Sequence, residues 1–228
     1  MKPWTILGRT RTLDGTELTL AQHPSEYAIL ANGQRLMSSR MHASEEALAL
    51  LGCGRARTLA RPRILVGGLG MGFTLRQALD CLPPTARVLV AELVPDIVAW
   101  NQGPLGALAK HPLDDPRVRV EVGDVAVTLR SSPDHFDAIL LDVDNGPVAL
   151  TASSNAALYN RHGVAAARAA LRPGGVLAVW SARDDPQFER RLRAAGFSVQ
   201  RTRVRSRPSG GSRHTVLVAR VRQCEAQS

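Results

Sequence analysis

From residue 63 onward, short apolar runs alternate with stretches in which apolar residues recur every three or four positions. The apolar runs predict strands at 63–66, 87–91, 118–122, 136–141 and 176–181. The amphipathic stretches predict helices at 73–81, 95–101, 125–130, 161–171 and 186–195. Strands and helices that alternate in this way form a parallel sheet with helices on both faces. The pattern therefore predicts an α/β, doubly wound fold.

The last two strand patterns predict a different connection. Ser198–Val204 and Thr215–Ala219 are joined through Pro208-Ser209-Gly210-Gly211, which is too short for a parallel crossover of a dozen residues or more. These two strands should therefore form an antiparallel hairpin. A mostly parallel, seven-stranded, Rossmann-like sheet that ends in such a hairpin resembles the class I S-adenosylmethionine-dependent methyltransferase fold.

Residues 1–43 have the pattern of β-hairpins. Asp14-Gly15 and Asn32-Gly33 are favoured tight-turn pairs, and short strand patterns lie near them at Glu17–Leu20 and Tyr27–Leu30. A small hairpin region is marginal on its own. We therefore expect it to pack as a lid or an edge on a main Rossmann-like domain formed by residues 44–228.

A short helix is predicted between these two regions. Ser44 is a candidate N-cap for a helix that runs from Glu45 to about Leu51. Gly52 and Gly54 then end the helical pattern.

The composition is that of a globular protein with ordinary hydrophobic content, 44%, in 228 residues. Cys53, Cys81 and Cys224 are scattered and suggest neither a disulfide framework nor a metal pair, which favours a reducing compartment. No stretch approaches the roughly 20 apolar residues of a membrane span. The N-terminus also lacks an apolar signal segment. We therefore expect a soluble cytoplasmic protein with no membrane partner.

A glycine-rich turn follows the first strand of the main domain. Gly68, Gly70 and Gly72 separate that strand from a helix, and Glu92 ends the next strand about twenty residues later. Glycines let backbone approach a ligand closely, and an acidic residue in this position can accept hydrogen bonds from ribose hydroxyls. The spacing predicts a nucleoside site. The structural alternative is an ordinary strand-to-helix turn with an exposed acid.

The next two strands also end in acidic residues. Gly123-Asp124 follows the third strand, where Asp124 is a candidate acceptor for the exocyclic amine of adenine and also a candidate N-cap for the helix that begins near Val125. Asp142 ends the apolar fourth strand, where partial burial would raise its pKa and suit it to take a proton from an attacking amine. Asp144 nearby would add to the attraction of a cationic acceptor. A simple turn is the alternative for both, because Asp, Asn, Gly and Pro favour turns.

These motifs resemble the spermidine synthase (polyamine aminopropyltransferase) family over the region Tyr27–Ser181. The GGGDGG-V-L-R pattern of that family aligns with Gly68–Arg76, and its acidic and G-D motifs align with Glu92 and Gly123-Asp124. Its D-S-S-D-P-x-G-P and L-Y motifs align with Asp142 through Pro147, with a shortening, and with Leu158-Tyr159. The resemblance implies aminopropyl transfer from decarboxylated S-adenosylmethionine to a small amine acceptor, with Asp144 and Tyr159 as substrate-binding residues. It also implies a possible homodimer.

Three departures from the family pattern leave the donor open. Met71 stands where the family has the Asp that holds the donor amine, and Trp180 stands where it has a glutamine. Ala43-Ser44-Glu45-Glu46 replaces a Tyr-His-Glu segment. Met71 cannot pair with an ammonium group, which favours methyl transfer from S-adenosylmethionine. Neither reaction requires a metal, and the six histidines show no ligand spacing: they are His23, His42, His111, His135, His162 and His214.

A basic stretch near the C-terminus adds another possible partner. Arg201, Arg203, Arg205 and Arg207 have one parity on a predicted strand and so share a face, in a chain of net charge +9. Such a face can attract RNA, although interleaved aromatic residues for base stacking are scarce. The alternatives are an RNA-directed methyltransferase, a non-catalytic nucleoside-binding module, or a solvated face of an arginine-rich chain.

Overall fold

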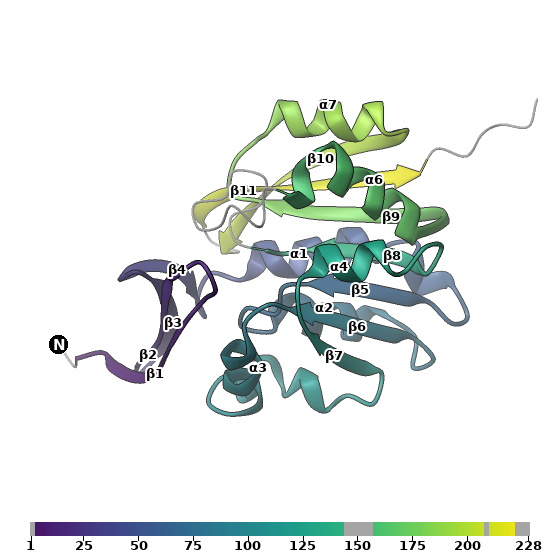
Figure 1. The fold of residues 1–228 in the computed structure, drawn as a ribbon. Coiled ribbons are helices and arrows are strands. Elements are labelled where there is room, and N and C mark those ends of the chain that lie inside the picture. The colour runs from purple at the N-terminus through teal and green to yellow at the C-terminus, as the bar shows by residue number, and fades with distance from the viewer. Residues whose placement is uncertain (1–2, 144–156, 208–209, 222–228) are drawn as a thin grey trace, which may run out of the picture.

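The computed structural model describes residues 3–143, 157–207 and 210–221, and it contains two β-sheets (Figure 1). The larger sheet has seven strands in the order β10-β11-β9-β8-β5-β6-β7. They are β5 (Arg63–Gly67), β6 (Arg87–Glu92), β7 (Val118–Val122), β8 (Phe136–Leu141), β9 (Leu171–Ser181), β10 (Phe197–Arg207) and β11 (Gly210–Val221). Strands β5 to β9 pair in parallel, whereas β11 runs antiparallel to both β9 and β10. The predicted fold class and the antiparallel hairpin are both confirmed.

Helices cover both faces of this sheet. One face carries α1 (Ala43–Gly52), α2 (Phe73–Cys81) and α3 (Pro95–Gln102), and the other carries α4 (Val125–Arg130), α6 (Arg161–Ala170) and α7 (Pro186–Ala194). Three short 3₁₀ turns lie at Ala56–Thr58, Gly106–Ala109 and Pro112–Asp114. None of the helices in the described part of the chain is long and apolar enough to cross a bilayer.

The sheet separates two hydrophobic cores because successive side chains of a strand point to opposite faces. On β5, Ile64 and Val66 enter the core under α1 and α2, whereas Leu65 enters the core under α4 and α6. Both cores receive fully buried side chains from the same strand. This explains why β5 appears in the sequence as an unbroken apolar run.

Strands β9, β10 and β11 are longer than the pattern predicted. Strand β9 begins at Leu171, which pairs with Phe136, and the register then shifts before Ala138 pairs with Val176. The segment Pro173-Gly174-Gly175 therefore lies inside β9 as an irregularity. Gly174 has a φ of 71°, as glycines in turns often do. The residues on both sides of this segment nevertheless pair with the same neighbouring strand, β8.

The N-terminal strands form a separate antiparallel sheet in the order β1-β2-β3-β4. They are β1 (Thr5–Arg11), β2 (Glu17–His23), β3 (Glu26–Ala31) and β4 (Gln34–Ser38). This sheet packs on the main domain, as expected for a region too small to fold alone. Thr10 Oγ1 donates a hydrogen bond of 2.6 Å to Asp96 Oδ2 on α3. The backbone of Gly8 lies so close to the ring of Trp100 that a Cβ there would be 2.7 Å from Nε1.

The predicted N-cap of α1 is wrong. The helix begins one residue before Ser44, and His42 occupies the cap position without a side-chain hydrogen bond to the helix. Ser44 is instead fully buried in the first turn, where its hydroxyl donates to Glu45 Oε2 at 2.6 Å. The Ser44 side chain therefore makes a buried polar contact and does not cap the helix. The local sequence pattern does not reveal this burial.

Candidate active site

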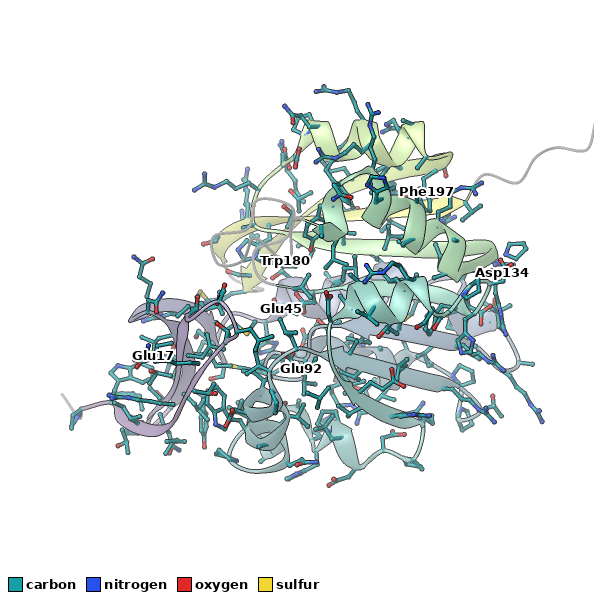
Figure 2. The ribbon with its side chains drawn as sticks, in the orientation of Figure 1. Glu17, Glu45, Glu92, Asp134, Trp180 and Phe197 are labelled. Carbon is teal, nitrogen blue, oxygen red and sulfur yellow. The ribbon has the colours of Figure 1, made fainter. Side chains whose placement is uncertain are left out.

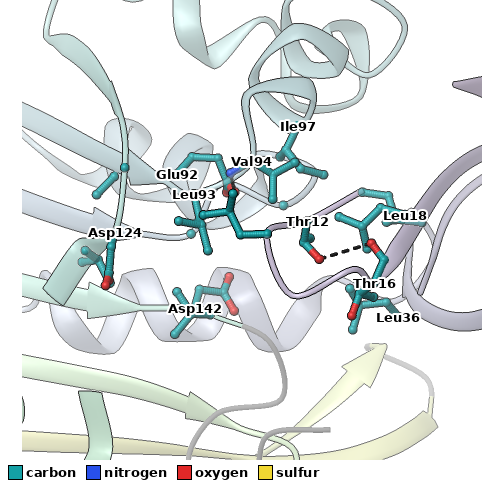
Figure 3. A pocket seen from close by; sticks show the side chains of 18 of the residues that line it. Thr12, Thr16, Leu18, Leu36, Glu92, Leu93, Val94, Ile97, Asp124 and Asp142 are labelled. Atoms are coloured by element: carbon teal, nitrogen blue, oxygen red, sulfur yellow. Dashed lines mark hydrogen bonds between the residues drawn. The ribbon is translucent and has the colours of Figure 1, made fainter. Parts of the chain in front are cut away.

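A cavity of about 420 Å³ lies at the carboxyl ends of the parallel strands (Figure 3). Parallel sheets of this kind bind ligands at that end. The main domain contributes the predicted residues Gly68, Gly70, Glu92, Gly123, Asp124 and Asp142 to its lining. The N-terminal sheet supplies the opposite wall, through the loop between β1 and β2 and through apolar side chains such as Leu18 and Leu36.

The glycine turn presents bare backbone to this cavity. Gly68 has a φ of 87°, and a Cβ at this position would lie 2.4 Å from the backbone oxygen of Asp142. Gly70 has a φ of 52°, and a Cβ there would lie 3.1 Å from both Sδ and Cε of Met37. Both the left-handed backbone and the close approach require glycine. The turn thus brings the first and fourth parallel strands together beside the cavity.

Glu92 is fixed by the same turn. Its Oε2 accepts a hydrogen bond of 2.8 Å from Leu69 N, and its Oε1 accepts one of 2.9 Å from Val94 N. The residue is only 7% exposed. Two backbone donors orient the carboxylate at the end of β6, where it borders the cavity, so the acid predicted for ribose binding is preorganised.

Asp124 has the capping role predicted for it. Its Oδ1 accepts a hydrogen bond of 2.8 Å from Ala126 N, which caps α4. The same side chain borders the cavity and comes from the end of β7, the strand next to β6. Capping therefore holds the carboxylate at a place where it can also reach a ligand.

Two of the predicted site residues that the structure describes, Gly72 and Tyr159, do not line this cavity. Gly72 is the N-cap of α2, where a Cβ would lie 2.9 Å from Asn101 Oδ1, and it does not border the cavity. Tyr159 is buried in the core, with its ring edge-on to Phe188 at a centroid distance of 5.3 Å. Asp144 lies outside the described residues. For Gly72 and Tyr159, the surroundings explain a packing role.

Asp142 lies where β8 ends. Its backbone N–H donates to Gly67 O at 2.8 Å, which keeps it beside the glycine turn. Its Oδ2 accepts a hydrogen bond of 2.5 Å from the hydroxyl of Thr74, at the start of α2. This hydrogen bond orients the Asp142 carboxylate where it borders the cavity.

A second carboxylate, Glu45, lies close to Asp142. A small pocket beside the main cavity is lined by both acids together with Ser38, Met71 and Thr74, and the two pockets share Asp142 and Gly70. Burial, and next the negative charge of Asp142, raise the pKa of Glu45 to about 8. Sequence reasoning did not select Glu45. Its only signal is that it lies within the segment Ala43–Glu46, where the family has Tyr-His-Glu, and nothing local distinguishes it from Glu46.

Glu45 is linked to the C-terminal hairpin through Ser44. The Ser44 hydroxyl lies 2.9 Å from Nδ1 of His214 on β11, and the imidazole packs edge-on against Trp180 at 4.7 Å. Burial lowers the pKa of His214, which favours its neutral form. His214 thus packs between Ser44 and Trp180, and Trp180 stands at the position where the family has a glutamine.

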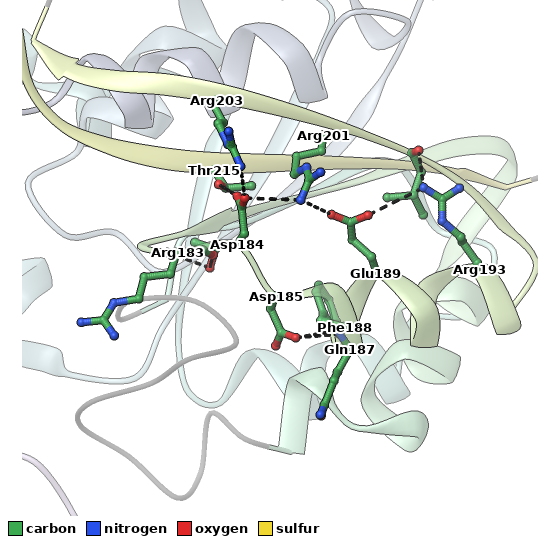
Figure 4. A network of polar contacts seen from close by, with 12 residues as sticks. Arg183, Asp184, Asp185, Gln187, Phe188, Glu189, Arg193, Arg201, Arg203 and Thr215 are labelled. Carbon is green, nitrogen blue, oxygen red and sulfur yellow. Dashed lines mark hydrogen bonds and ion pairs between the residues drawn. The ribbon is translucent and has the colours of Figure 1, made fainter.

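Half of the arginine face predicted near the C-terminus is paired with carboxylates (Figure 4). Arg201 and Arg203 approach Asp184 with N–O distances of 3.3 and 2.5 Å. Arg201 and Arg193 also approach Glu189, at 3.4 and 3.7 Å. These pairs offset part of the charge that was expected to attract RNA, whereas Arg205 and Arg207 are exposed. Throughout the described ranges, no group of three or more His, Cys, Asp or Glu residues is arranged to hold a metal ion.

Comparison with known proteins gives matches in both sequence and structure. The chain is 33% identical over 121 residues to a polyamine aminopropyltransferase of Nitrosomonas europaea, and 33% identical over 130 residues to polyamine aminopropyltransferase 2 of Pseudomonas aeruginosa. Each match covers 52% of this chain but only 34% and 33% of the relatives. The match thus spans about a third of the length of these curated relatives. No protein-family model matches the chain.

The structural matches cover nearly the whole chain. Spermidine synthase from Thermotoga maritima superposes with a TM-score of 0.73 and 18% identity, over 94% of this chain and 72% of that one. A spermidine synthase in complex with the transition-state analogue AdoDATO gives a TM-score of 0.72 and 18% identity, with the same coverage. Neither the sequence relatives nor these structures support an RNA partner or a methyl-transfer reaction. The chain is therefore spermidine synthase-like: it shares the class I methyltransferase-type fold of the spermidine synthases and is similar in sequence to polyamine aminopropyltransferases.

Proposed function

We propose that this protein transfers an aminopropyl group from decarboxylated S-adenosylmethionine to a small amine. The observation that carries the proposal is the gathering of Glu92, Asp124 and Asp142 at the ends of three strands around one cavity that is walled by bare glycine backbone. The names of the sequence relatives and of the spermidine synthase structures support the same reaction.

The cavity suits the nucleoside part of such a donor. Glu92, locked by Leu69 N and Val94 N, would accept hydrogen bonds from the ribose hydroxyls. Asp124 would accept one from the adenine amine, while Leu93 and Ile97 provide apolar surface for the ring. Each of these residues is positioned by the backbone before any ligand arrives, which reduces the entropic cost of binding.

The small acidic pocket offers a carboxylate for the donor's ammonium group, which Met71 cannot bind. Methionine cannot pair with the donor's ammonium group, but Glu45 borders the same pocket as Met71 and brings a carboxylate there from α1. A bound ammonium group next to Glu45 and Asp142 would favour ionisation of both acids. We therefore assign to Glu45 the role of an amine-binding carboxylate, in place of the missing aspartate.

Asp142 is the proposed base. The donor's sulfonium supplies an activated carbon, so the protein must align the acceptor and remove one proton. Asp142 takes a proton from the acceptor ammonium, and the freed nitrogen lone pair forms the new C–N bond as the C–S bond breaks. The electrons of the broken C–S bond stay on sulfur, so the sulfonium becomes a neutral thioether. The positive charge passes to the nitrogen of the product. Thr74 holds Asp142 for this transfer through their 2.5 Å hydrogen bond.

The experiment compares donors and variants. Purified protein is assayed with a diamine acceptor and either decarboxylated or ordinary S-adenosylmethionine, and binding of each donor and of methylthioadenosine is measured by calorimetry. We expect turnover only with the decarboxylated donor. Asp142→Asn should reduce turnover by about 10²–10⁴-fold, the usual contribution of a general base, with methylthioadenosine binding retained. Glu45→Gln should weaken binding of the decarboxylated donor but not of methylthioadenosine, which has no amine.

Three other outcomes would contradict this proposal. Turnover with ordinary S-adenosylmethionine alone would restore the methyltransferase hypothesis, and tight nucleoside binding without any turnover would indicate a non-catalytic module. Full activity in Asp142→Asn would remove Asp142 as the base. The homodimer implied by the family resemblance stays a prediction.

A further inference from the structure

A second hollow lies at the opposite end of the large sheet from the active site. Its volume is about 510 Å³, and its lining consists of Arg61, Arg63, Thr85, Arg87 and Arg172. Arg63 and Arg87 are the first residues of β5 and β6, and Arg172 is the second residue of β9. The hollow therefore belongs to the amino ends of the parallel strands, the end where Figure 2 labels Asp134. We call these four arginines and the hollow the arginine pocket.

Two of these arginines are direct neighbours in the sheet. Arg63 and Arg87 are register partners on adjacent parallel strands. Like charges placed opposite each other on neighbouring strands destabilise a sheet. An anion held between the two guanidinium groups would remove that repulsion.

Within the described part of the chain, the ion pairs of this cluster involve one carboxylate, that of Asp137. Asp137 accepts hydrogen bonds from Arg63 N at 2.8 Å and from a guanidinium nitrogen of Arg172 at 3.1 Å. Among the residues that the structure describes, Arg61, Arg63 and Arg87 form no ion pair. This contrasts with Arg201 and Arg203, which share Asp184.

His135, which lies next to this cluster, is also affected by the positive charges of the arginines. A guanidinium nitrogen of Arg63 lies 3.5 Å from Nδ1 of His135. Burial, followed by the charges of Arg63 and Arg172, lowers the pKa of His135 and disfavours a further cation. An anionic ligand is the group that would suit this environment.

We propose that the arginine pocket binds a small polyanion with two or three linked phosphate groups. Guanidinium groups bind phosphate oxygens in bidentate fashion, and arginine keeps its charge at all physiological pH values. A single hollow with converging arginines fits a compact anion better than a nucleic acid strand, which needs an extended groove and aromatic side chains for stacking. None of the described residues that line this pocket is aromatic. The site is independent of the reaction proposed above.

The test is calorimetric titration of the full chain with inorganic triphosphate. Arg61→Gln/Arg87→Gln removes two arginines that are exposed and have no ion pair in the described structure, so the fold should be kept. The matched control is Arg119→Gln/Arg130→Gln, which removes the same net charge from exposed positions outside the pocket. We expect the pocket variant to bind triphosphate at least about tenfold more weakly than wild type, a loss of about 1.4 kcal/mol, and the control to stay within about twofold.

Further arms separate the possible ligands. Orthophosphate should bind more weakly than triphosphate if several linked phosphates are recognised. Arg61→Lys/Arg87→Lys, which keeps the charge but loses the guanidinium fork, should also weaken binding, and it serves as the second variant if the glutamine pair disturbs folding. The proposal is overturned if wild type does not bind triphosphate at millimolar concentration, or if pocket and control variants lose affinity equally. It is also overturned if single-stranded RNA binds the pocket and triphosphate cannot displace it.

Discussion

Glu45 shows how much one side chain depends on its tertiary neighbours. It is the direct neighbour of Glu46, but Glu46 lies 2.9 Å from Nδ1 of His42, within hydrogen-bond distance, whereas Glu45 lines the small pocket together with Asp142. Asp142 belongs to the end of β8 and reaches Glu45 only in the folded chain. Two carboxylates that approach each other in this way do not both ionise easily. This makes Glu45 the side chain whose titration best reports on the site.

The first prediction concerns the pH dependence of stability. The folded protein holds the pKa of Glu45 at about 8, above its ordinary 4.5. Between these values the folded state keeps a proton that the unfolded chain loses, so the free energy of unfolding falls as pH rises, by at most about 1.4 kcal/mol per pH unit for one proton. The contribution is fully present below pH 4.5 and lost above pH 8. Glu45→Gln should flatten this decline in urea unfolding curves measured from pH 5 to 8.

The control is Glu17→Gln, on β2 of the other sheet, which should keep the wild-type slope. The groups that face Glu45 from the surrounding described elements are Asp142 beyond β8, Glu46 and His42 on α1, and His214 on β11 through Ser44. If Glu45→Gln and wild type show the same slope, Glu45 does not hold the proton.

At the scale of elements, the N-terminus of α4 borders the cavity through Asp124 and Val125. Asp124 ends the loop after β7 and caps α4 through the 2.8 Å hydrogen bond from Ala126 N. The helix cap and the proposed ligand contact use the same carboxylate. An alanine substitution would therefore lower both the stability of the protein and its affinity for the nucleoside. An asparagine separates them, because it is an equally good N-cap but presents an amide donor where aspartate presents an acceptor.

The second prediction follows from this difference. Asp124→Asn should change the free energy of unfolding by no more than about 0.3–1 kcal/mol, the usual worth of a charge at a helix N-terminus. It should weaken binding of methylthioadenosine about tenfold, the effect of losing one hydrogen bond to a charged group. Asp124→Ala should cost about 1 kcal/mol of stability in addition. Equal nucleoside affinity in wild type and Asp124→Asn would leave Asp124 with the capping role alone.

At the scale of the whole molecule, the cavity belongs to both sheets. Thr12, Thr16 and Leu18 line it from the N-terminal sheet, opposite Glu92 and the glycine turn (Figure 3). Leu13, at the tip of the β1–β2 loop, borders the cavity although it is 97% exposed. A nucleoside between the two sheets would provide the apolar surface that this side chain lacks. Ligand binding should therefore stabilise the contact between the sheets.

The third prediction is a pattern of amide hydrogen exchange. Methylthioadenosine should slow exchange in the β1–β2 loop as well as in the turn from Gly68 to Gly70, because both line the cavity. Exchange in the β10–β11 hairpin, which does not line the cavity, should be unchanged and serves as the internal control. Protection limited to the glycine turn would show that the N-terminal sheet takes no part in nucleoside binding.

The local sequence pattern determined the elements and the backbone of the site. Apolar runs such as Ile64–Val66 can be buried on both sides only as strands between two helical layers, and helices α2 and α4 begin and end where the pattern predicts. Gly68 has a positive φ in the turn after its own strand, and a capping residue such as Asp124 acts on its own helix. These are properties of neighbouring residues, so the order of amino acids is enough to reveal them.

Only the tertiary structure decided which side chains share a surface. It placed Glu45 against Asp142, buried Ser44 beneath His214, and put Tyr159 in the core. It also paired Arg201 with Asp184 and left Arg63 beside Arg87. The physical reason is that charge interactions act through space between residues far apart in the chain. Local periodicity sets which face of an element a residue occupies but not what lies opposite that face.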